Sequence, residues 1–489
     1  MKKLLYILTI STILFSGCKK QYEDLNKNPN GIKKGSPETL LSQTVYNIIV
    51  AKIRAAKNVG HDLMGYTLYK HERSYIQRFD IRSNVGNDLW NRQYTNLQNL
   101  KSMYDLAVEN GNTNYQAVAI TLKAFVMADL VDTFRDVPYF EATQGEDLNF
   151  LPKYDKQEDI YKDLLTNLDN AALLFNTAKT MDQAADILYG SKGSTSTQVT
   201  AWKKLCNSLR LRLYLRVSKD PSFKSAEKIA TIFNNSTTYP YITEAADNAY
   251  LAFTNELPFY NPYYSTPGGN FGSGHAPTTN IINMMLNPVQ DIRLTTYFTR
   301  SKLDWTPVPQ GFALGEGTAL FVNGTSILNN SLSTSPKLGM LMSSEEVKFI
   351  LAEARLKGWI TSSRTPLQYL EDGNKESAVF WTTNTQSTTY ITAVQNEYNA
   401  AANDEQRLAV IIKYKYLASF FRGLEAWFEH RRTGYPNLNV LPSTSNNGIV
   451  PSRLLYPVIA QRYNPTNYAN AVAGLGGKDD INIKSFWER

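Results

Sequence analysis

The spacing of apolar side chains divides this chain into helical stretches and irregular stretches. In residues 40–56, apolar residues recur every three to four positions, which places them along one side of a helix. The same spacing recurs in 90–108, 115–134, 158–175 and 201–218. We therefore predict amphipathic helices over these five stretches.

One of these stretches has two interpretations. Residues 209–216, LRLRLYLR, alternate like a half-buried strand. Leu205, Leu209, Leu213 and Val217 also keep a four-residue step, and leucine and arginine both favour helices. We predict a helix here.

Residues 236–342 lack this regular spacing and are rich in Pro, Gly, Asn, Ser and Thr. The stretch 260–277, YNPYYSTPGGNFGSGHAP, is predicted to be a loop, because its prolines and glycines interrupt helix and strand alike. A short hairpin is expected around ALFVNGTSIL, with Asn323 and Gly324 as its turn.

Helical spacing returns at Ser343, where Ser343 and Glu346 have the spacing of a capping box. A long helix is predicted from about 403 to 433, ended by Gly434 and Pro436. Arg431 and Arg432 would then lie in its last turn, at the negative end of the helix dipole. The chain reads as mostly α, with 37–235 and 343–435 mainly helical and 236–342 and 436–489 mainly irregular.

The N-terminus has the features of an export signal. Lys2 and Lys3 precede about twelve mostly apolar residues, which is too short for a membrane-spanning helix. Ser16 and Gly17 then precede Cys18, in a pattern that resembles a bacterial lipobox. We predict a signal peptide over 1–17, acylation of Cys18, and a tether over 18–36 that becomes ordered on the body. The alternative is an ordinary signal peptide with a chance cysteine.

Composition narrows the classes of partner. The 489 residues carry a formal net charge of +7 without a dense basic cluster, which argues against nucleic acid. Cys206 has no second cysteine besides Cys18, so we expect it to be a small buried residue. The four histidines lack metal-ligand spacing. The 30 tyrosines suit both sugar stacking and helix packing, so their number alone decides nothing.

Motifs for nucleotide, zinc-hydrolase or serine-hydrolase chemistry are absent from the sequence. The stretch EHRRTGYP could bind an anion, but helix termination explains the same residues. Residues 127–142 could bind a hard cation through Asp129, Asp132, Asp136 and Glu141, but they lack the dense ligand spacing of a calcium loop. We expect neither site, and no metal or other cofactor.

Seven stretches together resemble the SusD/RagB family of outer-membrane nutrient-binding lipoproteins of Bacteroidetes, in its SusD-like branch. In chain order these stretches are DLNKNPN (24–30), FRDVPYFEA (134–142), WKKLCNSLRLRLYLR (202–216), DIRLTTYF (291–298), SSEEVKFILAEARLKGW (343–359), GLEAWFEHRRTGYP (423–436) and IVPSRLLYP (449–457). The resemblance implies a scaffold of tetratricopeptide-like helix pairs and an irregular part that binds ligand. It also implies a non-catalytic surface protein that captures a ligand and delivers it to a SusC-like TonB-dependent barrel.

The ligand-binding residues vary within that family, so we choose candidates from the aromatic and polar residues of this sequence and their local context. We select the loop aromatics Tyr260, Tyr263, Tyr264, Phe271 and Trp305, together with Trp90, Arg82 and Asn91. Trp90 lies in NDLWNRQY, similar to a region that supplies aromatics in some members, although its helical spacing equally favours the core. We expect an oligosaccharide ligand. A peptide ligand, a surface glycoside hydrolase and a lid without a pocket remain as alternatives.

Overall fold

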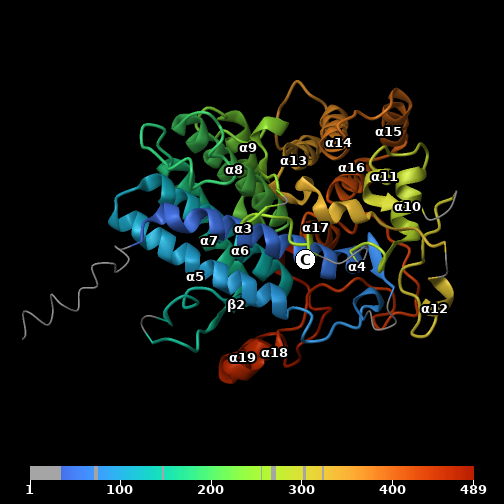
Figure 1. The fold of residues 1–489 in the computed structure, drawn as a ribbon, viewed down its shortest axis with the longest axis horizontal. Helices are drawn as coiled ribbons and strands as arrows, with labels where there is room; N and C mark the ends of the chain where they lie inside the picture. The colour runs from blue at the N-terminus through green and yellow to red at the C-terminus, as the bar shows by residue number, and fades with distance from the viewer. Residues whose placement is uncertain are drawn as a thin grey trace, which may run out of the picture.

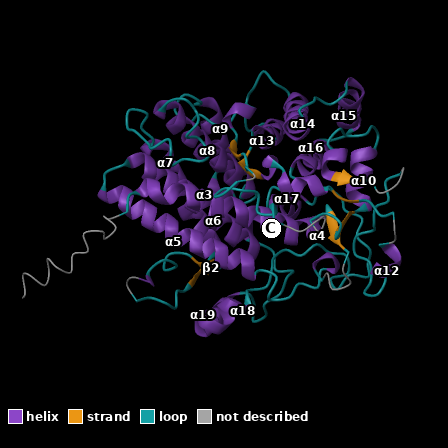
Figure 2. Cartoon of the chain, in the orientation of Figure 1, coloured by secondary structure: helices purple, strands orange, loops and turns teal. Residues whose placement is uncertain are grey.

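The computed structural model describes residues 35–70, 75–145, 148–254, 256–265, 271–300, 304–321 and 324–489. The predicted signal peptide, Cys18 and all of the predicted tether except Gly35 and Ser36 lie outside the described residues. The described part is mostly helical, as predicted, and its short strands form four two-stranded antiparallel sheets (Figures 1 and 2).

The N-terminal half is a series of long helices in which each packs on the next. Their apolar stripes face one another, which is how helix pairs of this kind bury surface that a single helix would expose. The helices are α3 (Pro37–Ala55), α5 (Asn87–Glu109), α6 (Thr113–Phe134), α7 (Gln157–Leu174), α8 (Thr195–Arg216) and α9 (Ser225–Asn234). Residues 209–216 therefore belong to a helix, as predicted.

A second helical group packs beside the first through α8 and α13 (Figure 1). It consists of α13 (Ser344–Leu356), α14 (Pro366–Thr382), α15 (Thr388–Ala400), α16 (Asp404–Ala418) and α17 (Glu425–Thr433). One continuous cluster of buried apolar residues runs through both groups, so the described helices share a single core.

Shorter elements occupy the irregular regions. The strands pair as β1 (Thr67–Tyr69) with β5 (His275–Pro277), β2 (Val137–Pro138) with β3 (Tyr154–Asp155), β4 (Ala249–Leu251) with β8 (Gly339–Met342), and β6 (Phe298–Thr299) with β7 (Ile327–Leu328). The short helices include η1 (Ala56–Gly60), α4 (His61–Met64), η2 (Ile76–Arg78), α10 (Thr279–Leu286), α11 (Leu294–Tyr297), α12 (Gly317–Leu320), α18 (Val458–Tyr463), α19 (Pro465–Gly474) and η8 (Phe486–Glu488). Residues 275–277 thus form a strand at the end of the predicted loop.

The prediction of one helix over 403–433 is wrong, because the chain turns between α16 and α17. Phe421 and Gly423 both have positive φ, 58° and 69°. A Cβ on Gly423 would lie 2.7 Å from Cγ of Lys52, so this turn lets the backbone approach α3 closely. The helix end at Gly434 is confirmed, with φ 82° in the left-handed region.

Two further local predictions are wrong. Ser343 precedes α13, but its side chain makes no capping hydrogen bond, and Glu346 binds Arg212 instead. The hairpin around 319–328 is absent from the described residues, since Ala319 and Leu320 are helical and β7 pairs with β6. Asn323 lies outside the described residues.

Candidate ligand-binding site

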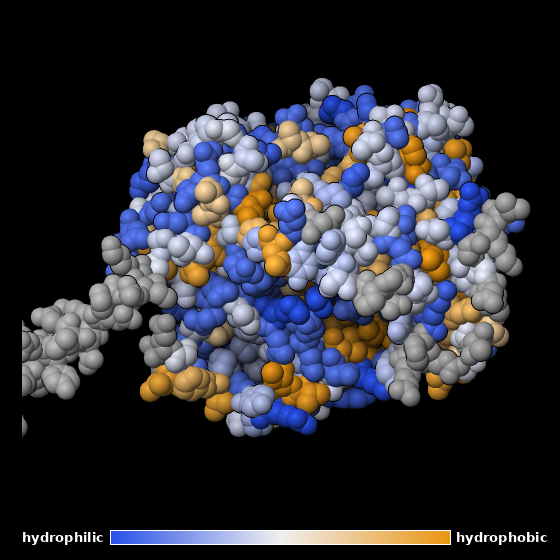
Figure 3. Space-filling view, viewed as in Figure 1, coloured by the Kyte–Doolittle hydropathy of each residue, from blue (hydrophilic) through white to orange (hydrophobic). Residues whose placement is uncertain are grey.

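A polar cavity lies between α3 and the first turns of α5. It has a volume of about 330 Å³ and is lined by Asn47, Asp88, Asn91, Arg92, Thr95 and Asn96. Four of these residues follow α5 at i, i+3, i+4 and i+7 spacing, so the helix presents them on one face. Arg92 donates to Asp88 at 2.8 Å, which fixes the charged end of the cavity. Figure 3 shows a strongly polar patch over this end of α5.

An aromatic loop, residues 256–265, lies beside this cavity. The hydroxyl of Tyr46, next to Asn47 on α3, donates to the carbonyl of Tyr260 at 3.0 Å. Its ring contacts Phe259 with centroids 5.5 Å apart. The rings of Tyr260 and Tyr264 meet edge to face at 6.4 Å, and Tyr264 is 45% exposed. Stacking faces and amide groups therefore lie next to each other.

The side chain of Asn261, which is fully buried, anchors the aromatic loop to the rest of the protein. Its amide donates to the carbonyls of Leu332 and Ser335 at 3.0 and 2.9 Å, and its oxygen accepts from the backbone of Tyr263 at 3.0 Å. These bonds fix the backbone that carries the rings, which reduces the ordering cost of a ligand that stacks on them.

Lys57 lies beneath the aromatic loop, on the π-helical segment η1. Its ammonium is 2.7 Å from Nε2 of His275 and lies 5.5 and 5.2 Å from the ring centroids of Tyr263 and Phe271. Burial lowers the pKa of Lys57 to about 8. Burial, together with the charge of Lys57, lowers the pKa of His275 to about 3. The ammonium is therefore the donor and the imidazole the acceptor.

A family described as "Starch-binding associating with outer membrane", the SusD-like family, matches residues 29–457, most of the chain. This chain belongs to that family. Its description names binding and no reaction, which agrees with the expectation of a non-catalytic protein. The comparison with curated proteins found no match.

Solved structures share the SusD-like fold. A SusD homologue from Bacteroides fragilis NCTC 9343 is 24% identical, with a TM-score of 0.78 over 93% of this chain and 99% of that chain. A homologue from Bacteroides uniformis ATCC 8492 is 24% identical, with a TM-score of 0.76 over 93% and 99%. A chitin-binding homologue from Flavobacterium johnsoniae is 20% identical, with a TM-score of 0.75 over 91% and 98%. At these identities the likeness establishes the fold alone.

The structure brings four of the predicted site residues of this SusD-like protein together. Asn91 lines the polar cavity, and Tyr260, Tyr263 and Tyr264 lie in the aromatic loop. The nearby charges of Asp88 and Arg92 act on the pKa of Tyr263, which burial raises most strongly. The site itself remains a prediction, now with a defined location.

Two predicted residues lie in the core. Trp90 is 8% exposed and packs on Tyr94, Phe134 and Tyr154, so its ring has no free face for a ligand. Phe271 is 2% exposed and lies between Tyr263 and Phe421. Packing explains both positions. The ring of Trp90 lies on the buried side of α5, and the ring of Phe271 lies beneath a loop, so each fills space in the core.

Two others lie outside the group that surrounds the cavity. Arg82 is exposed, pairs with Asp80 at 3.0 Å and stacks on the ring of Tyr75. Trp305 is half-buried, with the guanidinium of Arg300 5.6 Å from its ring.

Sequence reasoning missed several residues around the cavity. They are Tyr46, Asn47, Asp88, Arg92, Thr95, Asn96 and Phe259. The spacing of Asp88, Asn91, Arg92 and Thr95 along one helical face was a usable signal. The placement of Tyr46 and Asn47 opposite them was not, because it depends on how α3 packs on α5.

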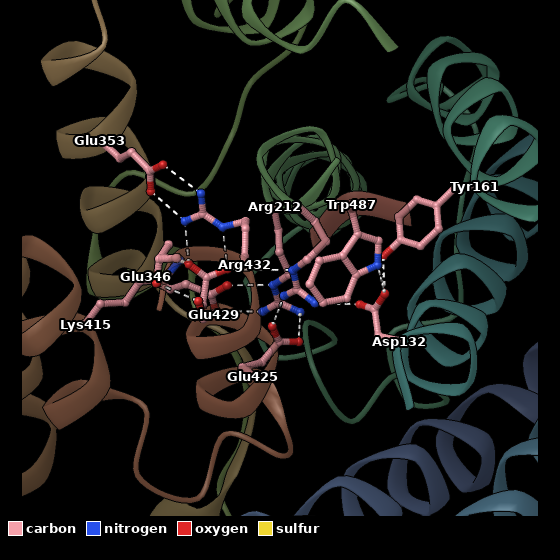
Figure 4. Close-up of polar contacts among 12 residues, drawn as sticks. Asp132, Tyr161, Arg212, Glu346, Glu353, Lys415, Glu425, Glu429, Arg432 and Trp487 are labelled. Atoms are coloured by element: carbon pink, nitrogen blue, oxygen red, sulfur yellow. Dashed lines mark hydrogen bonds and ion pairs between the residues drawn. The ribbon is translucent and has the colours of Figure 1, made fainter. Parts of the chain in front are cut away.

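Arg432 of the motif considered for anion binding and Asp132 of the motif considered for cation binding lie in a buried ionic network, shown in Figure 4. Glu141 lies outside this network and pairs with Lys153 at 3.6 Å. Arg432 forms a two-bond contact with Glu353 at 2.7 and 2.6 Å. Asp132 accepts from Arg216, Tyr161 and Trp487. Charges that are matched inside the protein leave no capacity for a ligand. Among the described residues no group of three or more His, Cys, Asp or Glu has metal-binding geometry.

In the described part of the chain, no helix combines the length and the apolar character needed to cross a bilayer. Cys206 is fully buried, as expected, and burial raises the pKa of its thiol to about 11. A thiol in this state is a poor nucleophile at neutral pH.

Proposed function

We propose that this SusD-like chain is a non-catalytic, lipid-anchored surface protein that captures an oligosaccharide and delivers it to a SusC-like TonB-dependent barrel. The observation that carries the ligand part is the polar cavity at α5 with the aromatic loop beside it. Amide and charged groups can bond sugar hydroxyls, while tyrosine faces stack on sugar rings. One similar structure is of a chitin-binding protein, which supports the same ligand class.

The ligand is tested by binding of the mature chain to immobilised chitin, starch and other oligosaccharides, with a peptide pool in parallel. Tyr264→Ala and Asn91→Ala should each weaken binding of the oligosaccharide found. A stacked ring contributes about 1–3 kcal/mol, so Tyr264→Ala should cost about 5- to 150-fold in affinity. Tyr463→Ala removes another exposed tyrosine, 74% exposed on α18, and is the control.

A peptide that binds with the same sensitivity to Tyr264→Ala would change the ligand class and keep the site. Binding that all three variants leave unchanged would place the site elsewhere. A bound oligosaccharide that is shortened over time would support the hydrolase alternative instead.

The anchor is tested separately in cells. Cys18→Ser should move the protein out of the outer-membrane fraction and abolish fatty-acid labelling, because several acyl chains on one residue give stable anchoring. Cys206→Ala removes the other thiol and should leave both unchanged. Co-purification of the barrel with the wild-type chain tests the delivery step, and its absence under mild detergent would contradict that step.

A further inference from the structure

A second cavity lies on the helical scaffold, between α5, α6 and α7. Its volume is about 260 Å³. Its floor is apolar, formed by Leu97, Leu100, Ile120, Ala124, Met127 and Leu164. The volume is below the roughly 300–1,000 Å³ that is typical of small-molecule sites, so it suits one or two side chains better than an oligosaccharide.

The rim of this cavity is basic. Lys101 and Lys123 both line it. Lys101 pairs with Asp105 at 2.5 Å, and the ammonium of Lys123 lies 4.4 Å from the ring centroid of Tyr139. Burial lowers the pKa of Lys123, because its charge is poorly solvated, and Asp163 opposes this only in part. A carboxylate placed at the rim would stabilise this charge.

An exposed apolar strip leads away from the cavity along α5. Tyr104, at the rim, and Val108, one turn further, are both exposed and share the helix face of Leu97, Leu100 and Lys101. This strip ends near the last turn of α5. The described chain begins at the same end, where Gly35 lies against Leu106.

The predicted tether contains a segment with matching chemistry. Its residues Tyr22, Glu23, Asp24 and Leu25 combine two large apolar side chains with two carboxylates. Leu25 lies ten positions before Gly35, which is about 33 Å when extended. The distance along α5 from Leu106 to Leu97 is only about 14 Å. We propose that Tyr22–Leu25 of the tether docks in this cavity, with Tyr22 and Leu25 on the apolar floor and Glu23 and Asp24 at the lysine rim.

Docking would shorten the anchor. Cys18 lies seventeen positions before Gly35, an extended reach of about 56 Å, but only four positions before Tyr22, about 13 Å. The docked tether holds the α5–α7 face close to the lipid anchor. This limits the orientations that the folded body can adopt at the membrane. It also raises the effective concentration of the body near any partner in the same membrane.

The test is cysteine cross-linking in the full chain in its membrane. Leu25→Cys is combined with Thr143→Cys at the cavity rim, or with Thr388→Cys, an exposed position on the remote helix α15, as the matched control. Under mild oxidation the cavity pair should form its intrachain disulfide at least about tenfold faster than the control pair. Equal rates for the two pairs, or a cross-link from Thr143→Cys to another chain, would overturn the proposal.

Charge exchange makes the test specific. Lys123→Glu should slow the cavity cross-link several-fold, and Glu23→Lys with Asp24→Lys in the same chain should restore it. Lys123→Gln removes the charge without reversing it and should slow the cross-link less. This variant also serves as the test if Lys123→Glu disturbs folding. A rate that none of these changes alters would also overturn the proposal. The measurement needs no ligand, so its failure is separate from failure of oligosaccharide binding.

Discussion

Buried charges lie both in the scaffold and beneath the aromatic loop, but their surroundings differ. In the scaffold, Arg216 donates to Asp132 at 2.5 Å and to Glu425 at 2.7 Å, so opposite charges surround it. Under the loop, Lys57 faces a neutral imidazole and two aromatic rings. The scaffold arginine therefore has two carboxylates in direct contact, whereas beneath the loop the carboxylate of Asp62 acts on Lys57 but does not outweigh the effect of burial on its pKa.

This difference has a physical consequence for each region. Burial alone would raise the pKa of Glu425, but Arg212 and Arg216 hold it at about 2, so the carboxylate stays charged. The network joins α6, α8, α13, α17 and η8, which are far apart in the sequence (Figure 4). Such a network fixes how the helices sit relative to one another. Lys57, by contrast, contacts the rings of Tyr263 and Phe271 next to it.

The largest expected effect comes from breaking the scaffold network. Arg216→Met leaves Asp132 buried without its ion-pair partner, which should lower the free energy of unfolding by about 3–5 kcal/mol. Glu425 loses one partner but keeps Arg212 at 3.2 Å. Urea unfolding of the variant measures this. Arg407→Met removes an exposed pair with Asp404 and should change stability by less than about 1 kcal/mol. Equal effects of the two variants would contradict the comparison.

The same logic predicts the opposite sign under the loop. The pKa of Lys57 is lowered to about 8 from 10.5, so the folded state binds this proton less well than the unfolded state. The cost is fully present below pH 8 and disappears as the pH rises to about 10.5. Lys57→Met should therefore stabilise the protein at pH 7 by at most about 3 kcal/mol, and by nothing near pH 10.5.

Thermal or urea unfolding across pH 7 to 10.5 checks this. Arg216→Met, measured in the same series, should stay destabilising throughout the range. Burial already raises the pKa of Asp132 to about 6 against the opposing charge of Arg216, so without Arg216 its ionisation at higher pH costs more. A destabilising Lys57→Met at pH 7 would show that the contacts of the ammonium with His275 and the rings outweigh its burial.

The sequence predicted the helices well and the contacts between them poorly. The periodicity of residues 40–56 and 201–218 depends on local spacing, so α3 and α8 were predictable. The break at Gly423 was not, because it depends on Lys52 of α3 lying beside it. Glu346 matched a capping box locally but is used by Arg212, more than a hundred positions earlier in the chain. Long-range partners override local preference in each case.

Some residues of the candidate site could be predicted from local sequence, and others could not. Loop composition identified Tyr260, Tyr263 and Tyr264, and helix spacing could have added Asp88 and Arg92. Trp90 illustrates the limit, since a tryptophan on an amphipathic helix lies in the core or at the site according to which side the neighbouring helix covers.

A medium effect is expected where the turn between α16 and α17 approaches α3. Gly423→Ala places a Cβ against Lys52 in a backbone conformation with φ 69°, and it should cost about 1–3 kcal/mol. Gly434→Ala has the same type of backbone, φ 82°, with open space around it, and should cost about 1 kcal/mol. Urea unfolding of both variants isolates the cost of the contact with Lys52. Identical losses would show that backbone strain alone accounts for Gly423.

The smallest effect on stability is expected in the aromatic loop. Tyr264 is 45% exposed and its ring meets that of Tyr260 edge to face, so Tyr264→Ala should change the free energy of unfolding by less than about 0.5 kcal/mol. Tyr161 is its scaffold counterpart, because its buried hydroxyl donates to Asp132 at 2.7 Å. Tyr161→Phe, which removes a single oxygen, should cost about 1–3 kcal/mol. If deleting a whole exposed ring costs less than deleting one buried hydroxyl, the rings of the loop are free for a ligand, and the scaffold is the part that cannot change. The reverse order, in the same urea titration, would mean that Tyr264 supports the fold and is a poor candidate for binding.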